Sequence, residues 1–214
     1  MPRREPTTAT GRRSPGRPRR VIEPAAVADA AAALFAEGGY DAVSIEAVAE
    51  KLAVSRATLY RTVPTKEHLL GVLFERSTRD LYQAAIAVIE KTPDPGDRMF
   101  GLVHLGISAA VTMRNYMPVF FGGAGLPSDV YARWQDWTRR YESLWVVTVN
   151  RAIEAGVLPP ADAMVTTRLL LGMCIWVSRW YRPDGTYSPE EITAAATRLL
   201  GKFACAPHAG ARSQ

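Results

Sequence analysis

Residues 44–61 read SIEAVAEKLAVSRATLYR, and this stretch decides the fold of the N-terminal part of the chain. Ser44 and Ser55 are suited to begin helices, because a serine hydroxyl accepts a hydrogen bond from the first turn of the helix that follows it. After each serine, apolar residues recur at helical spacing. We therefore predict two short helices, over residues 44–51 and 55–61, joined by a tight three-residue turn.

Helical spacing continues through nearly all of the chain from Val21 onward, without the sustained alternation that is typical of strands. The prediction is therefore an all-α fold. A long helix is expected over residues 65–91, ended by Pro93, Pro95 and Gly96. Thr65 is expected to cap this helix. The other predicted helices cover residues 21–37, 97–113, 115–121, 128–155, 161–181 and 188–205, of which the first should stop at Gly38-Gly39 and the last should be capped by Ser188.

The two short helices fit a helix-turn-helix that reads DNA. The second helix of such a unit enters the major groove by its N-terminal end, so small polar residues there can approach the edges of the bases. Residues 55–58 (SRAT) have this character, and Leu59 and Val63 are expected to face the core. Positive side chains surround the unit, for which a solvated basic face is the alternative explanation. They are Lys51, Arg56, Arg61 and Lys66.

A wider pattern extends over residues 21–75. It comprises Leu34-Phe35, Gly39-Tyr40-Asp41, Ser44-Ile45, Val48-Ala49, Val54-Ser55, Thr58-Leu59-Tyr60-Arg61, Lys66-Glu67 and Leu69-Leu70. In these residues the segment resembles the N-terminal domain of the TetR/AcrR family of transcriptional regulators. That family usually has glycine in the turn of the helix-turn-helix, where this chain has Ala53.

The resemblance implies roles for individual residues. Thr58 and Tyr60 would contact DNA from the recognition helix, and Lys66 would hold a phosphate. Phe35 and Tyr40 would build the core of the small N-terminal domain. The expected DNA-binding residues, with one arginine of the N-terminal arm included, are Arg17, Ser44, Ser55, Arg56, Ala57, Thr58, Tyr60, Arg61 and Lys66.

Most of the positive charge of the chain lies in residues 1–20. Seven arginines against Glu5 give this arm a charge of +6, whereas the whole chain carries +5. The arm has almost no large apolar residue, so we expect it to be disordered in isolation and to bind a polyanion. Residues 15–19 (PGRPR) resemble an AT-hook core, which would place Arg17 in the minor groove of DNA. A solvated, nonspecific tail is the alternative.

Several functional classes are excluded by what the sequence lacks. It has no P-loop, no HExxH or GxSxG motif and no GxGxxG after a strand, so we expect neither an enzyme nor a cofactor or metal site. No apolar segment approaches the ~20 residues of a membrane span, and Cys174 and Cys205 form no CxxC pair. We expect a cytoplasmic protein that binds no membrane. The rival is a polybasic protein that binds DNA or a membrane surface nonspecifically.

Aromatic residues mark the C-terminal half. Four of them recur at offsets of 0, 3, 7 and 11 and so share one helical face. This face either packs as ordinary core or lines an apolar ligand cavity opposite flexible and aromatic walls. His104 is expected to be a hydrogen-bonding group in the core or pocket. The other candidate ligand-binding residues here are Trp134, Trp137, Tyr141 and Trp145, facing Met113, Met117, Phe120 and Phe121.

A second resemblance involves residues 173–185 (MCIWVSRWYRPDG). This segment resembles TetR-family repressors of fatty-acid and steroid catabolism that respond to acyl-CoA thioesters. The resemblance implies that Met173, Trp176 and Trp180 wall an acyl cavity and that Arg179 or Arg182 meets the phosphates of CoA. The alternative is packing at a dimer interface with exposed arginines.

These observations give one picture of organisation and function. Residues 1–20 form the arm, 21–66 the helix-turn-helix domain, 67–206 a ligand-binding and dimerisation domain, and 207–214 a tail. The expected function is that of a homodimeric repressor, released from a palindromic DNA operator when a hydrophobic molecule such as an acyl-CoA binds. The last two long helices would form a four-helix interface with their symmetry mates.

Overall fold

The computed structural model describes residues 22–115, 117 and 127–204, with the side chains of Tyr40 and residues 202–204 left aside. All regular secondary structure in this part of the chain is helical, as predicted. Arg17, Phe120, Phe121 and nearly all of the helix predicted at 115–121 lie outside the described residues. The helices are α1 (Pro24–Ala42), α2 (Ile45–Lys51), α3 (Arg56–Thr62), α4 (Lys66–Lys91), α5 (Pro95–Met113), α7 (Ser128–Glu154), α8 (Ala163–Trp180) and α9 (Pro189–Ala204).

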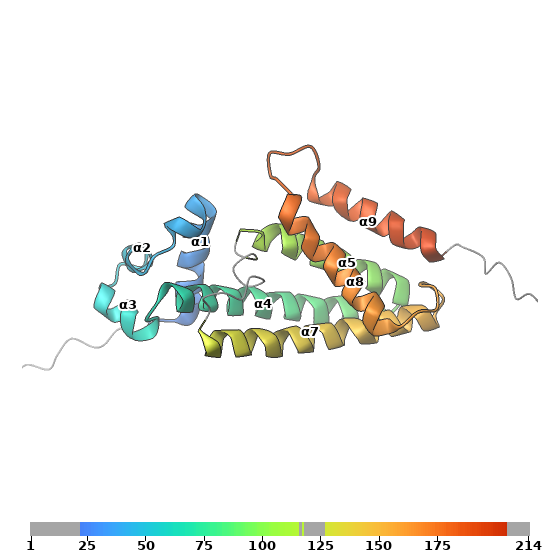
Figure 1. Cartoon of the computed structure of the whole chain (residues 1–214), viewed down its shortest axis with the longest axis horizontal. Helices are drawn as coiled ribbons and strands as arrows, with labels where there is room; N and C mark the ends of the chain where they lie inside the picture. The colour runs from blue at the N-terminus through green and yellow to red at the C-terminus, as the bar shows by residue number, and fades with distance from the viewer. Residues whose placement is uncertain (1–21, 116, 118–126, 205–214) are drawn as a thin grey trace, which may run out of the picture.

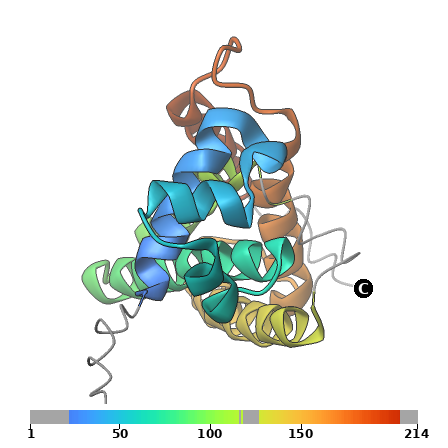
Figure 2. The ribbon, with the colours of Figure 1, turned by 90° about the vertical axis from the view of Figure 1, so that its left-hand side faces the viewer.

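The molecule is elongated, with its small N-terminal helices at one end (Figure 1). Helices α4 and α7 run alongside each other down the long axis, α5 and α8 pack on them, and α9 contacts α5. Figure 2 looks onto the end formed by α1, α2 and α3. Helix α4 begins beside α3 and continues into the larger bundle, so it connects the two parts of the chain directly.

The helix starts follow the capping residues that the sequence predicts. The hydroxyls of Ser44, Ser55 and Thr65 each accept a hydrogen bond from the backbone N–H three residues later, at 3.0, 3.1 and 3.3 Å. At α9, the backbone N–H of Ser188 donates to Glu191 at 2.8 Å while its hydroxyl accepts from the Glu191 N–H at 3.2 Å. Local sequence therefore sets where these helices begin.

Two boundaries show what glycine and proline do at helix ends. The regular part of α1 stops at Gly38-Gly39, as predicted, because Gly39 takes a left-handed conformation with φ +68°. Helix α4 ends at Lys91, as predicted. The next helix begins two residues before its predicted start at residue 97, because Asp94 caps α5 and Pro95 is its first residue. Proline fits that position because the first helical N–H has no partner within the helix.

The core has two parts that meet along α4. The first holds α1, α2 and α3 on the start of α4 and includes Phe35, Leu59 and Val63, all predicted core positions. It continues past residue 66 to Phe74 and takes in Met113 from α5. The second lies among α4, α5, α7, α8 and α9. Helices α1, α2 and α3 are thus packed on the larger helical bundle.

Candidate DNA-binding surface and ligand cavity

Helix α3 presents one face to solvent and buries the other. Leu59 is fully buried, whereas Arg56, Ala57 and Arg61 are exposed and Tyr60 is 45% exposed. Ser55 is exposed at the leading end, and the candidates Thr58 and Ser44 are half-buried. The predicted DNA-binding residues of α3 therefore share an accessible face, a necessary condition for reading base edges. Their contacts with DNA stay a prediction.

Hydrogen bonds orient the polar side chains on this face. The Tyr60 hydroxyl donates to Glu46 Oε1 on α2 at 3.1 Å, and the hydroxyls of Ser55 and Thr58 lie 2.7 Å apart. The backbone N–H of Glu46 and then the Tyr60 hydroxyl lower the pKa of the Glu46 carboxyl. Glu46 therefore stays ionised at neutral pH, and the Tyr60 ring is held against α2 at a fixed angle.

The turn between α2 and α3 closes on a left-handed alanine. Ala53 has φ +52°, the conformation that glycine adopts without steric cost. Two hydrogen bonds close the turn, from the N–H of Ala53 to Glu50 O at 2.9 Å and from the N–H of Val54 to Ala49 O at 3.0 Å. The replacement of the usual glycine thus leaves the turn intact but strained.

The positive rim is less uniform than the sequence indicates. Lys51 pairs with Glu37 on α1 at 2.7 Å, so the Glu37 carboxylate partly compensates the positive charge of Lys51. Lys66 is half-buried in the first turn of α4, next to the Thr65 cap. This leaves Arg56 and Arg61 as the exposed arginines of the recognition helix.

An apolar cavity of about 100 Å³ lies among α4, α5, α7 and α8. Five of the candidate ligand-binding residues line it: Met113, Met117, Trp134, Trp137 and Tyr141. Sequence reasoning missed the contribution of α4, because no motif marks it, and on α8 it named other residues than those that line the cavity. The remaining lining residues are Phe74, Thr78, Leu81, Gly106, Ala109, Ala110, Thr138, Leu171, Cys174 and Ile175.

Trp137 anchors one wall of the cavity. Its indole N–H donates to the backbone carbonyl of Thr78 at 3.0 Å, and its ring stacks on Tyr141 with centroids 4.9 Å apart. Phe74 meets the same ring edge-on at 6.1 Å. Because Thr78 and Phe74 belong to α4, a ligand that moves Trp137 also pushes on α4.

The Tyr141 hydroxyl is buried and lacks a hydrogen-bond partner among the described residues. Burial raises its pKa to about 12, and the nearby indole of Trp145 opposes this without completing a hydrogen bond. Burial likewise raises the pKa of Cys174 to about 12, so that thiol is not a nucleophile at neutral pH. An unsatisfied hydroxyl beside an apolar cavity can recognise one polar group of a ligand.

Several predicted cavity residues lie elsewhere. Trp145 is fully buried in the second core and does not line the cavity. Trp176 and Trp180 are 65% and 44% exposed, because α8 turns that face away from the bundle. Met173 is half-buried against the second core, and His104 is exposed on α5 instead of lying in core or pocket.

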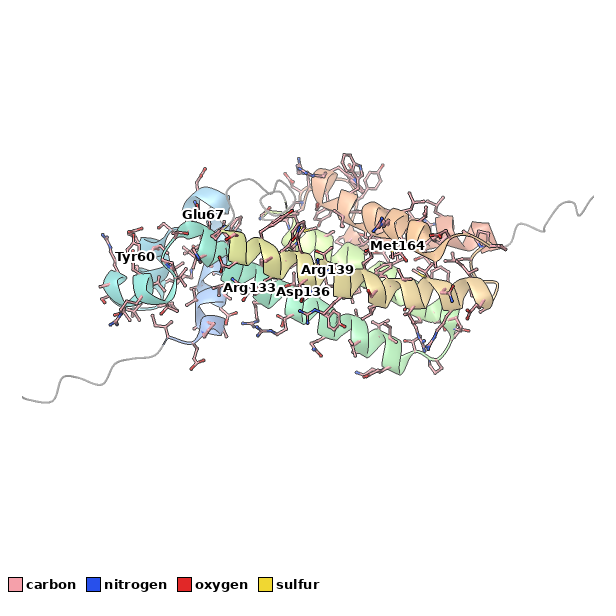
Figure 3. All side chains as sticks on the ribbon, turned by 60° about the horizontal axis from the view of Figure 1, so that its bottom comes forward. Tyr60, Glu67, Arg133, Asp136, Arg139 and Met164 are labelled. Atoms are coloured by element: carbon pink, nitrogen blue, oxygen red, sulfur yellow. The ribbon has the colours of Figure 1, made fainter. Side chains whose placement is uncertain are left out.

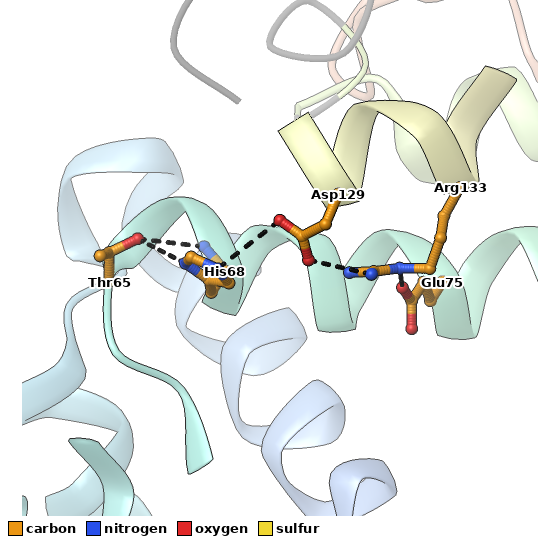
Figure 4. Close-up of polar contacts among 5 residues, drawn as sticks. All are labelled: Thr65, His68, Glu75, Asp129 and Arg133. Atoms are coloured by element: carbon orange, nitrogen blue, oxygen red, sulfur yellow. Dashed lines mark hydrogen bonds and ion pairs between the residues drawn. The ribbon is translucent and has the colours of Figure 1, made fainter. Parts of the chain in front are cut away.

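A polar chain connects the start of α4 to the start of α7 (Figure 4). The Thr65 hydroxyl lies 3.0 Å from His68 Nδ1, and Asp129 accepts a hydrogen bond from Arg133 Nη1 at 2.9 Å. Arg133 Nε also pairs with Glu75 on α4. The side-chain hydrogen bond from Arg133 is the main cause that lowers the pKa of Asp129. The cap of α4 beside α3 is therefore linked to the helix that carries Trp134 and Trp137.

The arrangement of an exposed recognition helix on a bundle with an inner apolar cavity defines a DNA-binding regulator. Family models agree: "Bacterial regulatory proteins, tetR family" matches residues 27–73, and "Tetracyclin repressor-like, C-terminal domain" matches residues 92–203. The chain belongs to the TetR family and is a ligand-responsive transcriptional regulator of that type.

Individual relatives resemble the chain over most of its length. The HTH-type transcriptional repressor KstR2 of Mycobacterium tuberculosis strain H37Rv is 26% identical over 168 residues, covering 76% of this chain and 82% of the relative. A TetR/AcrR regulator from Thermobifida fusca superposes with TM-score 0.74 at 24% identity, over 89% and 98% of the two chains. AibR, solved with isovaleryl coenzyme A and operator DNA, has TM-score 0.69 at 21% identity, over 85% and 98%. These two superpositions concern the fold.

None of the helices in the described part combines the length and hydropathy needed to cross a bilayer. Within the same residues, no group of three or more histidine, cysteine, aspartate or glutamate side chains is placed to hold a metal ion.

Proposed function

We propose that the chain is a homodimeric repressor that leaves a palindromic operator when an acyl-CoA thioester binds in the cavity among α4, α5, α7 and α8. The observation that carries the proposal is the apolar cavity on one side of α4, whose N-terminus adjoins the recognition helix. Thr58 and Tyr60 read bases, Lys66 and Arg61 hold phosphates, and the protein acts on DNA in the cytoplasm.

The thioester class is supported by the chemistry of the cavity. Its apolar walls suit an acyl group, and the unsatisfied hydroxyl of Tyr141 suits a thioester carbonyl as acceptor. Among the structural relatives, AibR was solved with isovaleryl coenzyme A and operator DNA, and KstR2 is a ketosteroid transcriptional regulator. An acyl group joined to a thioester fits both features of this cavity.

The dimer is supported by an exposed apolar face on α8 and α9. A monomeric protein rarely exposes many large apolar side chains on neighbouring helices. A two-fold axis along this face would form a four-helix interface and would hold two α3 helices about 34–36 Å apart, one turn of DNA. The exposed residues are Met164, Val165, Leu169, Trp176, Trp180 and Leu199.

The switch works through α4. A ligand between Trp137 and Tyr141 displaces the wall formed by Phe74 and Thr78, and α4 carries that displacement to its N-terminus beside α3. The two recognition helices then lose the spacing that the operator requires. A coupling of about 1–3 kcal/mol lowers operator affinity by about 5- to 150-fold.

The test begins with selection of DNA sites from a random pool by the full-length protein. A palindromic winner should outcompete bulk DNA by at least about 10³-fold. Acyl-CoA thioesters and neutral hydrophobic molecules are then screened for release of that winner. Absence of any preferred site would support the nonspecific polybasic alternative, and release by hydrophobic molecules but by no thioester would restrict the proposal to a different ligand class.

A further inference from the structure

An outer groove runs along α4 and α7, on the outer side of the wall that Trp134 and Trp137 form. It consists of two hollows of about 630 and 600 Å³ that share Tyr82, Asp136 and Arg140. Its lining positions on α7 extend from Val130 to Arg151, about 30 Å along the helix. The groove is therefore long enough for an extended ligand.

Arginines dominate the charge of this groove. Six arginines face three carboxylates, of which Glu75 pairs with Arg133 while Asp136 pairs with Arg139 and Arg140. The local surplus of three positive charges contrasts with the net charge of −1 carried by residues 21–214. Figure 3 looks onto this side, with Arg133, Asp136 and Arg139 following one another along α7 beside α4. The arginines are Arg79, Arg98, Arg133, Arg139, Arg140 and Arg151.

Three of these arginines, Arg79, Arg98 and Arg151, lack an ion pair within the described part of the chain, and two of the three are exposed. The side chains of Arg79 and Arg151 are exposed and form no ion pair with any described residue. Guanidinium groups match phosphate oxygens in geometry, so exposed arginines without an ion pair can bind the phosphates of an anionic ligand. Tyr82, half-buried where the two hollows meet, offers a ring on which a base can stack.

The outer groove and the inner cavity share a wall. Phe74, Thr78, Trp134 and Trp137 line both spaces, so a ligand that passes between these side chains can occupy both. The apolar space lies on the inner side of this wall and the arginine-rich space on its outer side. This arrangement matches a molecule with an apolar group at one end, a long uncharged linker and a phosphorylated nucleotide at the other.

We propose that the α4–α7 groove binds the phosphorylated nucleotide part of a coenzyme A thioester whose acyl group occupies the inner cavity. This inference rests on the proposed function. It assigns the phosphates to arginines of α4, α5 and α7, whereas the resemblance of residues 173–185 places them at Arg179 or Arg182. Those two lie at the end of α8, and neither lines the groove.

The test uses free coenzyme A, which carries the nucleotide without an acyl group. Its binding to the full-length protein is measured calorimetrically for wild type, for Arg79→Glu/Arg151→Glu, and for the control Arg179→Glu/Arg182→Glu, which makes the same charge change. We expect the groove variant to raise the Kd for coenzyme A about 10- to 100-fold and the control to leave it unchanged. Adenosine 3′,5′-bisphosphate should compete with coenzyme A, and pantetheine should not.

The outcomes separate the two proposals. The groove assignment is wrong if the wild-type protein does not bind coenzyme A at millimolar concentration, or if only the α8 variant loses binding. In either case the wild-type protein can still leave its operator on binding a thioester, which the release assay measures independently. Ligand-free operator binding and the thermal melting of each variant establish that the substitutions leave the fold intact.

Discussion

Asp129 in the first turn of α7 lies 3.9 Å from His68 in the first turn of α4, measured from Oδ1 to Nε2. His68 in turn contacts Thr65, the residue that caps α4 beside the recognition helix. Because the pKa of Asp129 is lowered, its carboxylate stays charged above about pH 5 and the contact with Arg133 persists. This relationship predicts how the cavity communicates with the DNA-binding end.

Asp129→Asn should weaken the coupling between effector binding and operator binding without disturbing the helix-turn-helix. The amide keeps the size of the side chain but loses the charge that pairs with Arg133 and lies 3.9 Å from His68. We expect ligand-free operator affinity to change less than about 3-fold, while the effect of the effector on that affinity falls by up to about 10-fold. Fluorescence anisotropy with labelled operator measures both. Asp80→Asn, which breaks only an exposed pair with Arg76 on α4, should leave the response unchanged.

Tyr60→Phe should weaken operator binding. The change removes the Tyr60 hydroxyl, which donates to Glu46. This hydroxyl is also the polar end of a side chain that is exposed on the recognition helix. Loss of a hydrogen bond to a charged group predicts a rise of about 10-fold or more in the operator Kd. Tyr187→Phe alters another exposed tyrosine, far along the chain from α3, and serves as the control. Equal operator affinity of both variants would exclude Tyr60 from the reading face.

Ala53→Gly should stabilise the helix-turn-helix. Glycine relieves the steric cost of φ +52°, and the greater freedom of glycine in the unfolded chain offsets part of that gain. The expected net increase in the free energy of unfolding is about 0.5–1 kcal/mol. Chemical denaturation of the two proteins measures it. A decrease would mean that the turn is not strained at this position.

Leu169→Glu should break the proposed homodimer. Leu169 is 70% exposed on α8, within the apolar face assigned to the two-fold interface. A carboxylate there has no partner when buried, so we expect monomers and loss of cooperative operator binding. Sedimentation analysis distinguishes the species. Val147→Glu places the same charge at an exposed apolar position on α7 and should leave the dimer intact.

Ala109→Leu should make the protein insensitive to its effector. Ala109 lines the inner cavity, and the three added carbons occupy much of its about 100 Å³. We expect operator binding to persist at effector concentrations that release the wild-type protein, with a melting temperature equal to or above the wild-type value. Effector release at wild-type concentrations would show that the ligand binds elsewhere.

The helix-turn-helix could be predicted from the sequence far better than the cavity. Caps and breakers act within a few residues, so Ser44, Ser55 and Thr65 were identified from their neighbours alone. Periodicity correctly grouped Trp137, Tyr141 and Trp145 on one face of α7. It could not tell that Trp145 packs in the second core, away from the cavity that Trp137 and Tyr141 line.

The α8 residues were misplaced for a related reason. Trp176 and Trp180 have the composition of a cavity wall, but the packing of α8 against α5 and α7 directs them outward. The α4–α7 groove left no pattern in the sequence, because its arginines come from three helices separated by up to 72 positions. Such sites depend on tertiary packing, which local sequence does not encode.

Met113 and Met117 belong to the core that holds the DNA-binding end and also line the cavity. A biosensor for a new inducer could be made by altering the cavity. Changing these two methionines would also loosen the packing of the DNA-binding helices, and would therefore raise expression of the regulated gene without inducer. Thr138, Leu81 and Leu171 line the same space without belonging to that core. A library restricted to these three positions should change inducer preference while keeping the uninduced state tight.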